Sequence, residues 1–216
     1  MHLKCDTPTT SDYSTAMDFI TRHREHYDSP NKIAQYLLRS FKKSVLSLVH
    51  KTKARTLFDV GCGDGHLSLF LADNGYQITG GDINPILVEQ ANKVVAERNL
   101  TNATSFEVLD IYSYDFSKIH VDMALCCEVL EHLPDPLLAL DRIAKIKTDT
   151  FLFSVPAEPI WRIMNICRLK YLSEFGNTPG HINHWGYLSF RSFLERRFAV
   201  SYILKPLPWI IALCKR

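Results

Sequence analysis

The sequence lacks the segments that would mark a membrane-spanning or disulfide-stabilised protein. It contains no run of about 18 uncharged apolar residues, so we expect no membrane-spanning helix. Its first 15 residues are polar and lack the apolar core of a signal peptide. The six cysteines include no Cys-x-x-Cys pair, which argues against a structural zinc site. We therefore expect a cytoplasmic protein with reduced thiols.

Dense basic runs and Arg-Gly tracts are also missing, so a dedicated nucleic-acid-binding arm is not expected. The net charge of +2 hides an uneven distribution, which is +5 over residues 1–55, −10 over 56–160 and +7 over 161–216. Basic flanks on an acidic centre favour an anionic ligand, because such flanks attract negative charge to the mouth of a site. The lysines of the first flank are expected on solvated helix faces, namely Lys42, Lys43, Lys51 and Lys53.

The pattern of apolar residues predicts one α/β domain preceded by helices. Helical spacing predicts helices over residues 14–28 and 31–51. Strand-like and helical segments then alternate, which implies a mostly parallel sheet with helices on both faces. The expected strands are 56–60, 77–81, 104–109, 121–127 and 150–155, with helices at 65–74, at 85–98 and after Pro136. Residues 157–175 are expected to be a helical insertion, and 198–204 with 209–214 a terminal hairpin.

Glycines alternate where the first strand ends, at Gly61, Gly63 and Gly65, and an amphipathic helix follows. Glycine permits a positive φ and a close approach of the backbone to a ligand, and the helix start presents unpaired N–H groups. The segment therefore predicts a nucleotide-binding turn.

Two common nucleotide-binding turns do not fit this segment. A dinucleotide fingerprint needs a glycine at position 66, where this chain has His66, so a dehydrogenase is disfavoured. The Gly-Lys-Ser/Thr ending of a phosphate-binding loop is absent. Asp59, two residues before Gly61, would repel a pyrophosphate but suits the amino group of S-adenosylmethionine.

At these residues the chain resembles the class I S-adenosylmethionine-dependent methyltransferases, whose first motif is an acidic residue followed by G-x-G-x-G. Asp82 ends the next strand, and the resemblance implies that it binds both ribose hydroxyls. Asp110 ends the third strand, at the place where the family contacts the adenine amine. Residues 128–136 are similar to the type 11 branch, which includes the ubiquinone-biosynthesis O-methyltransferases. The resemblance implies a Rossmann-like seven-stranded sheet with an antiparallel last strand.

The same resemblance implies which residues bind the cofactor and its product S-adenosylhomocysteine. They are Asp59, Gly61, Cys62, Gly63, Gly65, Asp82, Ile83, Asp110, Ile111, Cys127 and Glu128. Residues 1–52 are expected to form a helical extension that acts as a lid, in which Arg24 and Tyr27 contact the cofactor carboxylate. Residues 53–216 are expected to form the methyltransferase domain.

The insertion at about 157–187 is the predicted acceptor pocket, because ligands of open α/β sheets bind beyond the carboxyl ends of the strands. Arg162 and Arg168 could clamp a carboxylate bidentately, although one of them could instead pair with Glu158 or Glu174. Trp161 and Trp185 complete the predicted substrate-binding set.

The chemistry depends on the atom that is methylated. A carboxylate needs no base and an amine needs only its neutral form, whereas a hydroxyl must lose a proton. His184, His181 and His132 are the candidate bases, and the sequence does not rank them.

A divalent metal is possible but not favoured. Glu128, Glu131 and His132, with His184 or His181, could bind one. This Glu-x-x-Glu-His pattern resembles that of small-RNA 2′-O-methyltransferases and of some ubiquinone-pathway O-methyltransferases, which use a divalent ion. The same pattern also occurs in type 11 relatives without a metal.

These observations predict O-methylation of a small anionic metabolite or a peptide natural-product intermediate. N-methylation or metal-assisted RNA 2′-O-methylation is the first alternative, and a non-catalytic adenosylmethionine-binding protein is the second. The oligomeric state is left open by these motifs.

Overall fold

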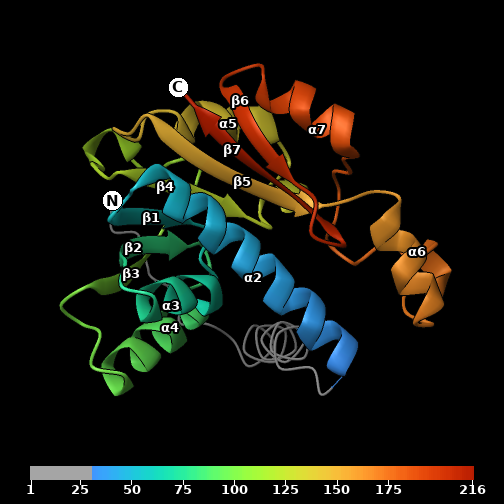
Figure 1. The fold of residues 1–216 in the computed structure, drawn as a ribbon, viewed down its shortest axis with the longest axis horizontal. Helices are drawn as coiled ribbons and strands as arrows, with labels where there is room; N and C mark the ends of the chain where they lie inside the picture. Colours follow the sequence, from blue (N-terminus) through green and yellow to red (C-terminus); the bar gives the residue numbers. More distant parts are fainter. Residues whose placement is uncertain (1–30) are drawn as a thin grey trace, which may run out of the picture.

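A single seven-stranded sheet forms the centre of the computed structural model, which describes residues 31–216 (Figure 1). The strands are β1 (Thr56–Val60), β2 (Gln77–Asp82), β3 (Thr104–Val108), β4 (Met123–Cys127), β5 (Thr150–Pro156), β6 (Ala199–Leu204) and β7 (Trp209–Lys215). Their order is β3-β2-β1-β4-β5-β7-β6, and β7 runs antiparallel to both of its neighbours while the other pairs are parallel. The predicted Rossmann-like sheet with an antiparallel last strand is confirmed.

Helices cover both faces of this sheet. On one face lie α2 (Lys32–Thr52), α3 (His66–Asp73) and α4 (Pro85–Glu97), and α2 crosses the front of the sheet in Figure 1. The other face packs against α5 (Pro136–Ile143) and α7 (Tyr187–Leu194). Residues 31–216 also form the short 3-10 helices η1 (Phe116–Lys118), η2 (Leu130–His132) and η3 (Leu172–Glu174). The predicted helix over residues 14–28, with Arg24 and Tyr27, lies outside the described residues.

The two apolar layers follow from the alternation of side chains along buried strands. All seven residues of β5 are buried, as expected for a strand covered on both faces. Phe151 and Phe153 point into the layer under α5 and α7, whereas Leu152 points into the layer under α2 and α3. The sheet is therefore a rigid support, and its carboxyl-end loops carry the polar residues.

Helix starts are set by side-chain caps. Asn84 accepts hydrogen bonds from the N–H groups of Ile86 and Leu87, and α4 begins at Pro85. The side chain of Asp135 accepts a hydrogen bond from the N–H of Leu138, and α5 begins at Pro136. The predicted helix after Pro136 is thus confirmed, although it ends after eight residues.

The insertion after β5 differs from its prediction. Only residues Ile160–Cys167 form an α-helix, α6, where a helical segment over 157–175 was predicted. Leu169, Tyr171 and Phe175 adopt a positive φ, so the chain leaves the helix and turns back. A Cβ at Gly176 would lie 2.4 Å from the carbonyl oxygen of Arg162, which shows how closely it returns to α6. The sequence analysis also missed α7.

No helix within residues 31–216 is both long enough and apolar enough to cross a bilayer. The longest described helix, α2, has 21 residues, but its buried side chains lie on one side only. It is an amphipathic helix packed on the sheet.

Candidate functional site

The glycine turn after β1 has the backbone geometry that its sequence predicts. Gly61, Gly63 and Gly65 have φ values of +76°, +55° and +76°. A Cβ at Gly61 would lie 2.4 Å from Cγ2 of Val129, so steric crowding as well as φ requires glycine there. The turn is fixed to β2 by hydrogen bonds from the N–H groups of Gly61 and Cys62 to the carbonyl oxygen of Gly81, at 2.8 and 3.0 Å.

Two of the predicted cofactor carboxylates lie at the ends of neighbouring strands. Asp82 accepts hydrogen bonds from the N–H of Gly63 at 3.0 Å and from that of Asn84 at 2.9 Å, so it connects β2 to the glycine turn. Asp110 accepts from the N–H of Tyr112 at 2.9 Å and from Oγ of Ser113 at 3.0 Å. Beside them, Ile83 is 68% exposed and Ile111 is buried.

Asp59 is a buried carboxyl below the glycine turn. Oγ of Ser68 donates a hydrogen bond to it at 2.5 Å. Burial raises the pKa of Asp59 to about 6, although the bond from Ser68 acts in the opposite direction. A cationic ligand group beside Asp59 would favour its ionised form.

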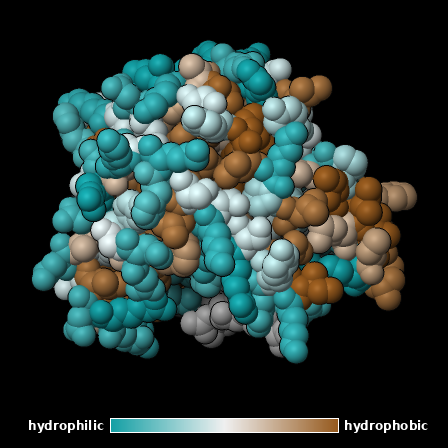
Figure 2. Space-filling model, in the orientation of Figure 1, coloured by the Kyte–Doolittle hydropathy of each residue, from teal (hydrophilic) through white to brown (hydrophobic). Residues whose placement is uncertain are grey.

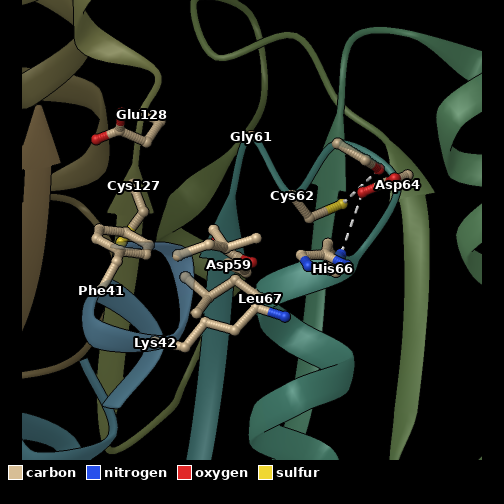
Figure 3. Close-up of a pocket in the computed structure, with 12 residues that line it drawn as sticks. Phe41, Lys42, Asp59, Gly61, Cys62, Asp64, His66, Leu67, Cys127 and Glu128 are labelled. Carbon is tan, nitrogen blue, oxygen red and sulfur yellow. Dashed lines mark hydrogen bonds between the residues drawn. The ribbon is translucent and has the colours of Figure 1, made fainter. Parts of the chain in front are cut away.

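A pocket opens between the glycine turn, the end of β4 and α2 (Figure 3). Phe41 and Lys42 extend into it from α2, opposite Cys62, Asp64 and His66. The full lining is Leu38, Phe41, Lys42, Asp59, Gly61, Cys62, Gly63, Asp64, His66, Leu67, Cys127 and Glu128. We call it the cofactor pocket, because it contains six of the predicted cofactor-binding residues.

Several residues of this pocket were missed by the sequence analysis. Leu38 and Phe41 have the spacing of ordinary core residues in an amphipathic helix, and Lys42 was predicted on a solvated face. The structure instead gives Lys42 a half-buried position in the pocket, whereas Lys43, Lys51 and Lys53 are exposed as predicted. Helical spacing predicts which side of α2 faces the protein, but not where a pocket lies beneath it.

Glu128 is held between β5 and β7 at the end of β4. Ser154 Oγ donates to its Oε1 at 2.9 Å, and Trp209 Nε1 donates to its Oε2 at 2.7 Å. Burial raises the pKa of Glu128 to about 8, although these two bonds lower it. Its φ of +58° is uncommon for a residue with a side chain. Trp209 has no motif that would have identified it.

Glu131, His132 and His181 form a compact cluster next to this edge. Their potential ligand atoms all lie within 4.8 Å of one another, and the two imidazole rings meet edge to face at 4.8 Å. Burial and then the charge of Glu128 raise the pKa of Glu131 well above its usual value. Nδ1 of His132 lies 3.0 Å from the carbonyl oxygen of Gly180. A carbonyl can only accept, so Nδ1 carries the proton and, in the neutral ring, Nε2 carries the lone pair.

The predicted metal set is only partly brought together. Glu131 and His132 meet His181, whereas Glu128 bonds to Ser154 and Trp209 and His184 contacts Arg162. The buried Oε2 of Glu131 has no hydrogen-bond partner within the described part of the chain. One carboxylate and two imidazoles are a donor set that suits a divalent transition metal.

The two candidate arginines have different surroundings. Arg162 pairs with Glu158 at 3.5 Å and donates to Nε2 of His184 at 2.8 Å, so its charge is used inside the insertion. Burial and the Arg162 charge lower the pKa of His184. Arg168 is exposed, and no carboxylate of residues 31–216 lies within ion-pair distance of it.

The two candidate tryptophans lie over opposite faces of the sheet. Trp161 packs in the layer beneath α2, and its ring lies 5.9 Å from that of Trp209. Trp185 packs in the other layer against Phe190 and Phe193, with ring centroids 5.9 and 5.1 Å away. Trp161 and Arg168 line a second pocket beside α2, together with Trp209.

Comparisons with known proteins agree with this architecture. A family model described as a methyltransferase domain matches residues 23–197. The ubiquinone biosynthesis O-methyltransferase of Haemophilus ducreyi is 37% identical over 112 residues, covering 48% of this chain and 48% of that protein. The probable chloroplastic tocopherol O-methyltransferase of rice is 33% identical over 95 residues, covering 44% of this chain and 26% of that protein. The chain spans between about a quarter and a half of the curated relatives it matches.

Solved structures share the fold at low sequence identity. Magnesium protoporphyrin IX methyltransferase of Synechocystis with bound S-adenosylhomocysteine superposes with a TM-score of 0.71 at 19% identity, over 95% of this chain and 97% of that one. The methyltransferase domain of bacterial CtHen1 superposes with a TM-score of 0.66 at 20% identity, over 83% of this chain and all of that one.

Proposed function

Because the chain belongs to the class I S-adenosylmethionine-dependent methyltransferase family, we propose that it transfers the methyl group of S-adenosylmethionine to an oxygen atom of a small anionic acceptor. The O-methyltransferase names of its curated relatives support oxygen as the acceptor atom. The basic flanks around the acidic centre support an anionic acceptor.

Cofactor binding in this proposal uses the pocket below α2. The methionine part of the cofactor lies over the glycine turn, where Asp59 attracts the cationic amino group. Asp82 accepts hydrogen bonds from the ribose hydroxyls, and Asp110 lies near the adenine with Ile83 and Ile111. Lys42 lines the pocket from α2, so its positive charge would attract the cofactor carboxylate, in addition to the predicted Arg24 and Tyr27.

The single observation that carries the assignment to a hydroxyl oxygen is the hydrogen bonding of His132. The hydrogen bond between its Nδ1 and Gly180 leaves the lone pair of the neutral ring on Nε2, 4.0 Å from Oε1 of Glu131. A histidine fixed in this tautomer next to a carboxyl group can accept a hydroxyl proton, as a general base does. Nitrogen and carboxylate acceptors would not need such a base.

The reaction then requires little further chemistry from the protein. The acceptor oxygen forms a bond to the methyl carbon as the carbon–sulfur bond breaks, and the sulfonium becomes the neutral thioether of S-adenosylhomocysteine. The hydroxyl proton moves to Nε2 of His132, and the Glu131 carboxyl stabilises the resulting imidazolium when ionised. The remaining task is to align the three reacting atoms and exclude water, for which α2 covers the pocket.

Metal-assisted methylation, including that of an RNA 2′-hydroxyl, is a second candidate. The observation in its favour is the cluster of Glu131, His132 and His181 with the orphaned Glu131 oxygen. These three residues would hold a divalent ion, which when bound lowers the pKa of an acceptor hydroxyl. In that case His132 would be a ligand and could not act as the base.

Titration and transfer measurements test both versions. Calorimetric titration with S-adenosylhomocysteine should show micromolar binding, and titration with NAD should show none. Label from S-adenosylmethionine should then appear in one pool among phenols, hydroxy acids, carboxylic acids, amines, peptides and RNA. Failure to bind S-adenosylhomocysteine would overturn the cofactor assignment, and label only in the amine or carboxylic acid pool would overturn the hydroxyl acceptor.

Chelation separates the base from the metal. We expect transfer to survive exhaustive treatment with EDTA and to fall in His132→Gln, with unchanged binding of S-adenosylhomocysteine. Loss of transfer with EDTA and its recovery with one added divalent ion would replace His132 as base by the metal.

A further inference from the structure

A second pocket lies next to the cofactor pocket, between α2, α6 and the turn that leads into β7. Its walls are mainly apolar and include Leu37, Leu38, Trp161, Met164 and Trp209. Arg168 lines the same pocket from the end of α6. An aromatic and aliphatic cavity with one guanidinium group is the composition that typically binds an organic anion.

The two pockets share a wall. Leu38 lines both of them, and Phe41 of the cofactor pocket lies against Trp209 of the second, with ring centroids 4.9 Å apart. The indole of Trp209 also donates its hydrogen bond to Glu128, which lines the cofactor pocket. A molecule in the second pocket would therefore lie directly beside the bound cofactor.

Arg168 is the charged residue that lines this pocket, and it has no partner carboxylate among residues 31–216. Arg162, which lies outside the pocket lining, pairs with Glu158. The guanidinium fork can bind a carboxylate or phosphate through two parallel hydrogen bonds. An exposed arginine beside an apolar cavity, with no carboxylate partner within the described part of the chain, leaves this capacity for a ligand.

The surface around α6 is apolar as well. Ile163, Ile166, Leu169, Leu172 and Phe175 are exposed, and hydrophobic residues gather over this segment at the right of the molecule in Figure 2. Ile33 and Tyr36 on the neighbouring part of α2 are also exposed. The approach to the second pocket therefore favours a ligand with a large apolar body.

From these observations we propose that the second pocket binds the non-reacting part of the acceptor, which is a flat aromatic or polycyclic ring that carries an anionic group. The ring lies against Trp161 and Trp209, and its carboxylate or phosphate pairs with Arg168. The hydroxyl to be methylated extends past Leu38 toward the cofactor. This proposal rests on the proposed methyltransferase function and adds to it the class of acceptor.

The role of such a pocket is to supply binding energy away from the reacting atoms. Contacts to a remote part of a substrate hold the hydroxyl in line with the methyl group and the sulfur. Arg168 and the tryptophans would thus act on acceptor binding and positioning, while His132 acts on the proton.

The probe for this pocket is 2-naphthoate, with its neutral isostere 2-naphthamide as the control for charge. Binding is followed by quenching of tryptophan fluorescence, because two of the three tryptophans line the pocket. We expect 2-naphthoate to bind with a Kd below 1 mM and at least about tenfold more tightly than 2-naphthamide, as one charge-assisted pair predicts.

Two variants locate the binding. Arg168→Gln should weaken 2-naphthoate to the level of 2-naphthamide, while Arg191→Gln, an exposed arginine on α7, should change nothing. Ala34→Phe fills the pocket from α2 without lining the cofactor pocket, so it should abolish binding of both probes. Ser47→Phe places the same ring on an exposed position of α2 and is its matched control.

S-adenosylhomocysteine titration of the same variants keeps the two proposals separate. The second-pocket proposal fails if S-adenosylhomocysteine binds but 2-naphthoate does not. It also fails if Ala34→Phe and Arg168→Gln leave the binding of 2-naphthoate unchanged. In both cases the methyltransferase function stands. If 2-naphthoate binds as expected but S-adenosylhomocysteine does not, the methyltransferase function fails. The second pocket is then a site for aromatic anions, but its ligand is not a methyl acceptor.

Discussion

The cofactor edge and the acceptor side of this protein are built in opposite ways. The cofactor edge, Asp59, Gly61–Gly65, Asp82 and Asp110, is formed by turns between consecutive elements. Its connecting hydrogen bonds span 19 residues from Gly63 to Asp82, 20 from Gly61 to Gly81 and 27 from Asp82 to Leu109. The proposed acceptor side, Glu131 and His132 with the second pocket, is assembled across the chain, and Glu128 connects it to the cofactor pocket. Its hydrogen bonds span 48 residues from His132 to Gly180 and 81 residues from Glu128 to Trp209.

This difference explains why the cofactor edge could be predicted from the sequence and the proposed acceptor side could not. A turn is encoded by the residues that form it, so glycine spacing alone predicts its positive φ values. A wall made by α2, α6 and β7 depends on how the sheet brings them together. Substitutions should separate the two halves: the cofactor edge should control S-adenosylhomocysteine affinity, and the acceptor side should control turnover.

The largest effect is expected for Gly61→Ala. Its Cβ would collide with Val129 in a backbone conformation that alanine rarely adopts, so S-adenosylhomocysteine affinity should fall more than about 100-fold. Gly75→Ala is the matched control, because Gly75 has a φ of +89° but nothing within 4 Å of a Cβ. Calorimetric titration measures both variants, with circular dichroism to confirm folding. The double variant with Val129→Ala should recover part of the affinity; equal losses in both glycine variants would show that φ, not the collision, matters.

His132→Gln should be the largest effect on the acceptor side. Removing a general base typically lowers a rate by about 100-fold or more, so kcat for a hydroxyl acceptor should fall by that amount. S-adenosylhomocysteine affinity should stay within about twofold, because His132 does not line the cofactor pocket. Initial rates at saturating substrate and calorimetry provide the two numbers. A large loss of affinity with unchanged kcat would break the comparison between the two halves.

Asp82→Asn should weaken S-adenosylhomocysteine by about tenfold or somewhat more. The amide keeps the shape but loses the charge, and its NH₂ would face the N–H of Gly63 or Asn84. Asp73→Asn, which alters an exposed ion pair with Arg98, serves as the control and should bind normally. The measurement is a titration of each variant at pH 7.5. Unchanged affinity in Asp82→Asn would remove the ribose role from this residue.

The smallest effect is a pH dependence of stability. Folding raises the pKa of Asp59 from 3.8 to about 6, so the folded state binds this proton more tightly than the unfolded state. Its contribution to stability is therefore fully present below about pH 4 and is lost as the pH rises through 6. Asp59→Asn should be relatively more stable than wild type at pH 7.5 than at pH 5, in urea unfolding.

Asp122 should show the opposite pH dependence of stability. Hydrogen bonds from the N–H groups of Thr56 and Arg55 lower its pKa, so its contribution is present at neutral pH and is lost on acidification. Asp122→Asn should therefore be less stable than wild type at pH 7.5, with a smaller difference at pH 4. The same sign for Asp59 and Asp122 would contradict the burial of Asp59 as the cause of its shift.

Much of the fold was predictable because its signals are local. Strand limits were predicted within two residues, since glycines and asparagine or aspartate caps mark the turns. The insertion was harder to predict, because Leu169 and Tyr171 adopt a positive φ although neither residue type favours it. Their sequence therefore does not indicate the end of α6. The eight-residue helix α7 was not predicted.

In the candidate site as well, residues positioned by local turns were predicted, whereas residues positioned by distant elements were not. The predicted acids and glycines are positioned by adjacent turns, as their spacing implies. Trp209 and Leu38 were not found, because each looks like a core residue until β7 and α2 are placed beside the pockets. The difference between Arg162 and Arg168 also needed the structure, since only their neighbours decide which charge is paired.

The antiparallel insertion of β7 has a consequence for the order in which the protein becomes functional during synthesis. Although β7 follows β6 along the sequence, it lies between β5 and β6. A nascent chain that stops before Trp209 leaves β5 with an open edge, Glu128 without its indole donor and the second pocket without a wall. The glycine turn can fold early, but the proposed acceptor side is complete only when β7 has been translated and inserted. Acceptor binding would thus require that synthesis has passed β7.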